Sequence, residues 1–112
     1  METAFIGLDY IFDIACDGGK MATSAECVTN NNVISKANAA IEFARNNGWI
    51  VIQAKLGFSP SYIECPEGSP MLSGARGLDA LGLYDFGTNF HKDLDVREGD
   101  IIIVKHRISV FY

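Results

Sequence analysis

A run of four β-branched residues near the end of the sequence most constrains the fold. Ile101 to Val104 contains no polar residue that would mark a wet side, so the run predicts a strand buried on both faces. Lys105 follows it directly, seven residues before the sequence stops. Open α/β sheets place their ligands and reactive groups at the carboxyl ends of parallel strands. Lys105 is therefore a candidate site residue.

Two further apolar runs predict strands with a helix between them. Residues 4–8 are closed by Asp9, and residues 49–54 are closed by Lys55. The intervening segment has asparagines at 30–32 available as caps, Gly48 just past its end, and apolar residues at helical spacing, namely Val33, Ala37, Ala40, Ile41 and Ala44. Strand, helix and strand form a right-handed unit with parallel strands. The expected fold class is α/β, with a doubly wound parallel sheet.

The segment from Gly57 to Gly99 carries all three prolines and most of the glycines. Its helical periodicity is weak, apart from a turn around residues 73–81. Loops of this length inside a compact domain are usually functional, so we expect it to form one wall of a pocket.

Size and charge limit the classes of partner. The 112 residues, 48% hydrophobic and 21% charged, suit one globular domain or part of one. A net charge of -5 argues against nucleic acid or an anionic membrane as a partner. No stretch approaches the roughly 20 apolar residues of a membrane span, and no leader pattern opens the sequence, so we expect a cytoplasmic location.

Asp9 follows its strand as Lys105 follows its own, so the two side chains emerge at one edge of a parallel sheet. At about 4 Å and an effective dielectric near 20, such a pair attracts by roughly 4 kcal/mol before desolvation is subtracted. A purely structural ion pair, or two independent surface charges, explains the spacing equally well.

Other candidate groups are weaker. His91 and His106 lie far apart without acidic residues at matching spacing, so no metal site is expected. The three cysteines are odd in number, show no CxxC pattern and have no histidine close by in sequence to activate them, namely Cys16, Cys27 and Cys65. We expect reduced thiols with no catalytic role.

Four stretches resemble the isochorismatase-like hydrolases, also called the cysteine hydrolase superfamily. Their order and spacing match the family across nearly the whole chain. They are GLDYIFD at 7–13, GFSP at 57–60, GTNFH at 87–91, and GD at 99–100 with VKHRISVFY at 104–112. The last is the most specific. In the first, Tyr10 and Ile11 replace the usual methionine and glutamine, while Asp9 and Asp13 remain. The nicotinamidase branch has an Asp-x-His metal motif where this chain has residues 55–58, so metal binding of that type is not expected.

The resemblance implies a six-stranded parallel sheet of order 3-2-1-4-5-6 with helices on both faces, a three-layer α/β/α Rossmann-like fold. Residues 1–112 then form the N-terminal part of one such domain, apparently truncated after the third strand. The rest is expected from another chain, from unrecorded sequence, or to be replaced by self-association into a homo-oligomer.

The resemblance also implies a catalytic triad of aspartate, lysine and cysteine. Asp9 acts as the acid or base, Lys105 holds its carboxylate, and the nucleophilic cysteine comes from sequence not present here. The implied substrate is a small molecule with an amide, carbamoyl or vinyl-ether bond, with Phe58 as an aromatic wall and no cofactor. In the isochorismate-cleaving branch the cysteine is not required. The alternative is an inactive fragment or assembly module that keeps the family fold, and the 112 residues alone are expected to be inactive.

Overall fold

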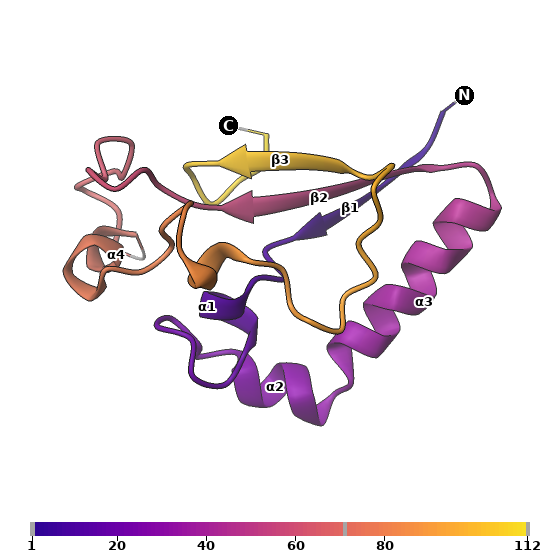
Figure 1. The fold of residues 1–112 in the computed structure, drawn as a ribbon, viewed down its shortest axis with the longest axis horizontal. Helices are drawn as coiled ribbons and strands as arrows, with labels where there is room; N and C mark the ends of the chain where they lie inside the picture. The colour runs from indigo at the N-terminus through magenta and orange to yellow at the C-terminus, as the bar shows by residue number, and fades with distance from the viewer. Residues whose placement is uncertain (1, 71, 112) are drawn as a thin grey trace.

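A three-stranded parallel sheet lies along one side of the molecule, with the helices that connect its first two strands on the other side (Figure 1). The computed structural model describes residues 2–70 and 72–111. Strand β2 (Ile50–Leu56) lies between β1 (Ala4–Leu8) and β3 (Ile101–Lys105), and both neighbours pair with it in parallel. This confirms the predicted α/β class and the order 3-2-1 for the first three strands.

Helix α3 (Val33–Asn46) makes the predicted connection between β1 and β2. Its apolar face is buried against Phe5 of β1 and Val51 of β2, and consists of Ile34, Ala37, Ile41 and Ala44. Gly48 lies just past the helix with φ 72°, a conformation that glycine adopts without strain. The predicted asparagine cap is wrong in detail: Asn32 occupies the N-cap position, but its side chain makes no capping hydrogen bond.

The other helices are short. They are α1 (Phe12–Ala15), α2 (Ala25–Asn30), α4 (Ser73–Leu78) and a 3₁₀ turn, η1 (Phe86–Thr88). Such lengths show too little periodicity to predict from sequence, and only α4 was expected. It ends before the predicted residue 81 because Asp79 and Leu81 adopt φ values of 53° and 60°. Among the described residues, no helix is long and apolar enough to cross a membrane.

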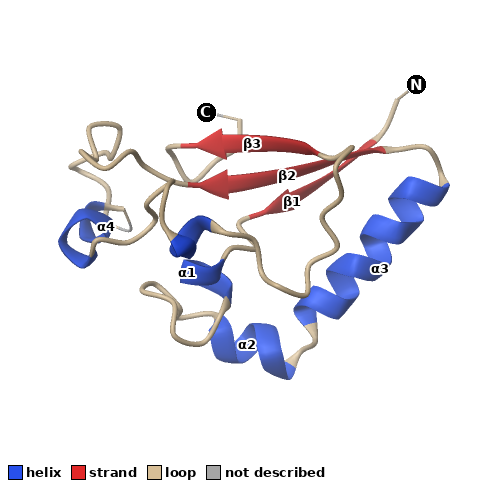
Figure 2. Cartoon of the chain, viewed as in Figure 1, coloured by secondary structure: helices blue, strands red, loops and turns tan. Residues whose placement is uncertain are grey.

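All of the helices beside the sheet cover the same face (Figure 2). Partners in register share a face, so Ile6 and Ile101 lie with Ile52 on the opposite side, as Leu8 and Ile103 lie with Ala54. That opposite side, the open face, carries no helix within the described ranges. The exposed fractions of its Ile6, Leu8, Ile101 and Ile103 are 37%, 49%, 47% and 38%.

The predicted burial of Ile101 to Val104 is therefore wrong. Each of the four side chains is 38% to 47% exposed. The physical reason is that β3 lies at the edge of the sheet and has a neighbour on one side only. The predicted end of the second strand also moves: β2 continues to Leu56, because Lys55 and Leu56 pair with Val104 and Lys105.

Gly7 is in contact with the side chain of Gln53, its partner in β2. A Cβ atom at Gly7 would overlap Gln53 Oε1, so a larger residue here would require the amide end of the Gln53 side chain to move. Gln53 is fully buried, and neither polar atom of its amide has a hydrogen-bond partner in the described part of the chain. The glycine in the first motif thus leaves room for the packing of Gln53 next to the site.

Candidate active site

Asp9 and Lys105 form an ion pair at the carboxyl edge of the sheet. Lys105 Nζ lies 2.9 Å from Asp9 Oδ2, and the side chains are 6% and 22% exposed. Asp9 Oδ1 accepts a hydrogen bond of 2.8 Å from the backbone N–H of Leu56. The sequence prediction that the two charges meet is confirmed, and β2 lies between the strands that supply them.

The ammonium group of Lys105 has no donor left for a substrate. It donates to the carbonyl oxygens of Arg107 at 3.1 Å and Ile108 at 2.7 Å as well as to Asp9. Three acceptors match the three N–H bonds of a lysine. Lys105 therefore holds the Asp9 carboxylate and the 106–108 turn together.

The backbone of Asp9 turns its carboxylate out of the strand direction. Its φ is 61°, in the left-handed region that aspartate tolerates better than most residues. Its N–H donates to the carbonyl oxygen of Ala54 at 2.9 Å, which ties the turn to β2. Each carboxylate oxygen has accepted one strong interaction and has further acceptor capacity. The carboxylate can therefore still accept a hydrogen bond from a ligand.

A cavity of about 410 Å³ opens beside Asp9. Its volume is in the range of small-molecule sites. Most of the wall is apolar. Its apolar residues come from α1 and the segment after it, from the end of β2, from the region around α4 and from the turn after β3, and they are Ile14, Met21, Leu56, Leu72, Leu78, Leu81 and Ile108. The predicted role of the 57–99 loop as a pocket wall is thus confirmed.

Asp13 joins two walls of this cavity. Its Oδ1 accepts from the N–H of Lys20 at 3.2 Å, and its Oδ2 accepts from the N–H of Leu81 at 2.8 Å. The side chain is buried, and a Cβ atom at Gly87 would overlap its carboxylate. Lys20 and Leu81 both line the cavity. Sequence reasoning noted Asp13 only as a motif residue, and no sequence signal shows that it joins segments 68 residues apart.

Phe58 is fully buried in the core rather than in the cavity wall. Its ring packs against Tyr62 and His106, with centroids 5.9 Å and 6.0 Å apart. Tyr62 donates a hydrogen bond of 2.6 Å to the carbonyl oxygen of Ala80, and burial followed by the charges of Asp79 and Asp85 raises the pKa of its phenol. Contact between Phe58 and a substrate stays a prediction.

None of the three cysteines lines the cavity beside Asp9. All are free thiols: Cys27 is exposed, Cys16 is half-buried, and Cys65 is buried with its Sγ 3.2 Å from the carbonyl oxygen of Leu72. Burial raises the pKa of the Cys16 thiol, which disfavours the nucleophilic thiolate.

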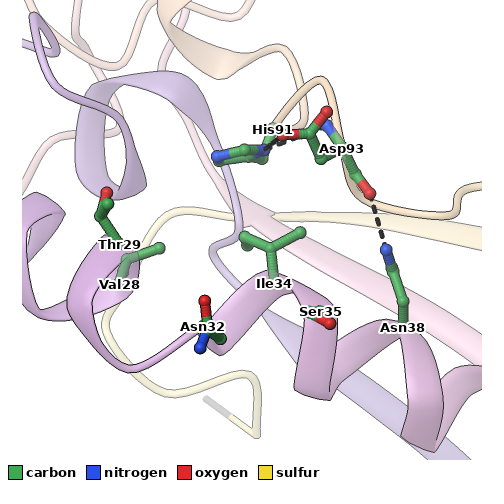
Figure 3. Close-up of a pocket in the computed structure, with 8 residues that line it drawn as sticks. All are labelled: Val28, Thr29, Asn32, Ile34, Ser35, Asn38, His91 and Asp93. Atoms are coloured by element: carbon green, nitrogen blue, oxygen red, sulfur yellow. Dashed lines mark hydrogen bonds and ion pairs between the residues drawn. The ribbon is translucent and has the colours of Figure 1, made fainter.

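A second cavity, of about 350 Å³, lies between the α2–α3 region and residues 91–93 (Figure 3). His91 Nδ1 accepts from the N–H of Asp93 at 3.1 Å, and Asn38 Nδ2 donates to the carbonyl oxygen of Asp93 at 2.7 Å. Neither Asp9 nor Lys105 lines this cavity. Another cavity, of about 410 Å³, is lined by Lys105 but not by Asp9. We take the cavity that Asp9 lines as the candidate active site, because its carboxylate is accessible there.

The fold and site define a parallel α/β protein with an aspartate–lysine pair beside a small-molecule cavity. The isochorismatase domain matches residues 3–112, and the chain belongs to this family. No match was found among curated proteins.

Solved structures support the fold assignment. The pyrazinamidase of Pyrococcus horikoshii, solved in complex with zinc, is 21% identical, with a TM-score of 0.69 over 95% of this chain and 52% of its own. The N-carbamoylsarcosine amidase of Thermoplasma acidophilum is 22% identical, with a TM-score of 0.69 over 100% and 56%. The pyrazinamidase/nicotinamidase of Streptococcus mutans is 17% identical, with a TM-score of 0.71 over 98% and 60%. The chain thus spans about half the length of the structures it matches.

Proposed function

We propose that the chain supplies part of the active site of a hydrolase that cleaves an amide, carbamoyl or vinyl-ether bond in a small molecule. Asp9 is the acid or base and Lys105 positions it. The observation that carries this proposal is the Asp9–Lys105 ion pair, because Lys105 holds the Asp9 carboxylate in the wall of a cavity where a ligand can reach it. Family membership agrees with it.

In the amide and carbamoyl version, the nucleophile is a cysteine thiol. Asp9 takes the thiol proton, and the thiolate attacks the carbonyl carbon. As the C–N bond breaks, Asp9 returns the proton to the leaving amine and an acyl-enzyme thioester remains. Water then cleaves the thioester and restores the thiol. Since no described cysteine lines the cavity, we expect this thiol from sequence outside these 112 residues.

In the vinyl-ether version, no thiol is needed. Asp9 in its acid form protonates the terminal vinyl carbon, and water adds to the resulting oxocarbenium ion. The adduct loses a proton and separates into a carbonyl compound and an alcohol. The two versions use the same carboxylate but differ in their need for cysteine.

Labelling with iodoacetamide distinguishes the two versions. In the full-length protein carrying Cys27→Ser, which removes the exposed thiol, the amide version predicts one cysteine that is alkylated rapidly. Asp9→Asn is expected to slow that alkylation at least about tenfold, because a base that assists thiol ionisation contributes on this scale or more. Peptide mass spectrometry identifies the residue. If Asp9→Asn leaves every alkylation rate unchanged, the thiol mechanism is contradicted.

The open face favours a second candidate function, that of an inactive assembly module. Its exposed isoleucines and leucine, together with the edges of β1 and β3, offer apolar surface and unpaired backbone groups to another polypeptide. We infer that this surface pairs with a second copy of the chain or with a chain that supplies the remainder of the fold.

The mass of the 112-residue polypeptide in solution tests this inference. The expected result is a species of at least twice 12.2 kDa by light scattering, because the exposed apolar side chains of the open face favour association in water. Replacing Leu8 and Ile103 by threonine is expected to reduce this association. A stable, folded monomer of 12.2 kDa would contradict the inference.

A further inference from the structure

The cavity beside Asp9 has a second charged group on its wall. Besides the apolar residues, its lining includes Lys20 and the hydroxyl residues Thr23 and Ser24. Among the described residues that line it, Asp9 and Lys20 are the charged ones, and they have opposite signs. A ligand in this cavity therefore meets one negative and one positive group across an apolar surface.

Lys20 differs from Lys105 in having donors available. Its Nζ donates a hydrogen bond of 2.9 Å to the carbonyl oxygen of Asp79, and no carboxylate within the described ranges pairs with it. Two of its three N–H bonds can therefore reach a ligand. The carboxylate of Asp13 accepts hydrogen bonds from two backbone N–H groups, those of Lys20 and Leu81.

Lys20 is exposed, and its backbone is held at one point. Its N–H donates to Asp13 Oδ1 at 3.2 Å, and the other oxygen of the same carboxylate accepts from the N–H of Leu81. The base of the lysine side chain is thus anchored relative to the apolar part of the cavity. A long exposed lysine normally loses much of its binding contribution to conformational freedom, and this anchoring reduces that loss.

We propose that the substrate carries a carboxylate or similar anionic group that binds Lys20, with an apolar body of about the size of one aromatic ring. This inference rests on the proposed function, since the bond to be cleaved is placed at Asp9. Charge sets the orientation: an anionic group is repelled by Asp9 and attracted by Lys20, so the opposite end of the molecule faces Asp9. Lys20 is a specificity-determining residue of the site.

Two probes that share one ring and one primary amide, and that differ in whether a carboxylate or its methyl ester lies opposite, test this assignment. They are 4-carbamoylbenzoate, which has a primary amide and a carboxylate on opposite sides of one ring, and its uncharged methyl ester. The full-length protein is expected to bind the acid about fivefold to tenfold more tightly than the ester in calorimetric or NMR titrations. That range is typical of one charge-assisted contact partly open to solvent.

The variants isolate Lys20. Lys20→Met is expected to remove the preference for the acid while leaving the affinity for the ester unchanged, and Lys20→Arg is expected to restore the preference. Lys36→Met is the matched control, because Lys36 is exposed on α3 and does not line the cavity. All variants are checked for unchanged thermal unfolding, so that loss of fold is not mistaken for loss of a contact.

Measuring the binding of each probe and the release of ammonia from it distinguishes failure of this inference from failure of the proposed function. Preference for the acid without ammonia release, in wild type as in Asp9→Asn, supports the Lys20 assignment and counts against amide hydrolysis. Ammonia release at equal efficiency from both probes supports hydrolysis and overturns the Lys20 assignment. Failure of both probes to bind, or a preference that survives in Lys20→Met, also overturns it.

Discussion

Lys105→Met is expected to lower the free energy of unfolding of the full-length protein by about 3 kcal/mol, the lower end of the cost of breaking a buried ion pair, because the Asp9 carboxylate left behind is 22% exposed. The side chain of Lys105 is 6% exposed and its Nζ holds Asp9 and two backbone carbonyl oxygens. Methionine fills a similar volume but donates nothing, so the Asp9 carboxylate and both carbonyl groups lose a donor together. Urea denaturation measures the change.

A double-mutant cycle supplies the control. Asp9→Asn keeps an acceptor for the Leu56 N–H and suits the left-handed backbone, so the double variant Asp9→Asn with Lys105→Met removes both charges without new strain. Its destabilisation is expected to be smaller than the sum of the two single changes. Lys36→Met, an exposed site, is expected to stay within about 0.5 kcal/mol of wild type. Additive single changes would show that Asp9 and Lys105 are not coupled.

The strand ends could be predicted from sequence because they follow from local rules. A short apolar run closed by a charge marks both the strand and the group at its carboxyl end, and a helix between two such runs makes the strands parallel. These rules predict that Asp9 and Lys105 meet, and in the structure they form an ion pair of 2.9 Å. The family motifs indicate that these two residues are partners. They do not predict that the carbonyl oxygens of Arg107 and Ile108 accept the remaining hydrogen bonds of the Lys105 ammonium group.

What the sequence could not predict depends on contacts between distant segments. The isoleucine run indicates a buried strand by composition, whereas its exposure depends on whether anything lies beside β3. The link from Asp13 to Leu81 spans 68 residues and leaves no periodic pattern. Lys20 likewise looks like an ordinary loop lysine, and only the cavity shared with Asp9 gives it a role.

The acid or base role of Asp9 predicts the largest effect on catalysis. For whichever amide, carbamoyl or vinyl-ether compound the full-length protein hydrolyses, Asp9→Asn is expected to lower kcat about 10²- to 10⁴-fold, the contribution typical of a general acid or base. Asparagine keeps the size of the side chain and tolerates φ 61°, but it can neither take nor give the proton. Steady-state kinetics with direct product detection measures the change, and KM is expected to change much less than kcat.

Asp17→Asn is the matched control, because Asp17 is an exposed carboxylate just after α1 and does not line the Asp9 cavity. It is expected to leave kcat within about twofold, since no reacting group touches it. A competing effect is loss of fold, because Asp9→Asn also removes the counter-charge of Lys105; binding of an unreactive ligand and the unfolding curve separate the two. If a folded, ligand-binding Asp9→Asn protein keeps more than about a tenth of wild-type kcat, Asp9 is structural, and the proton transfer must be assigned to another group.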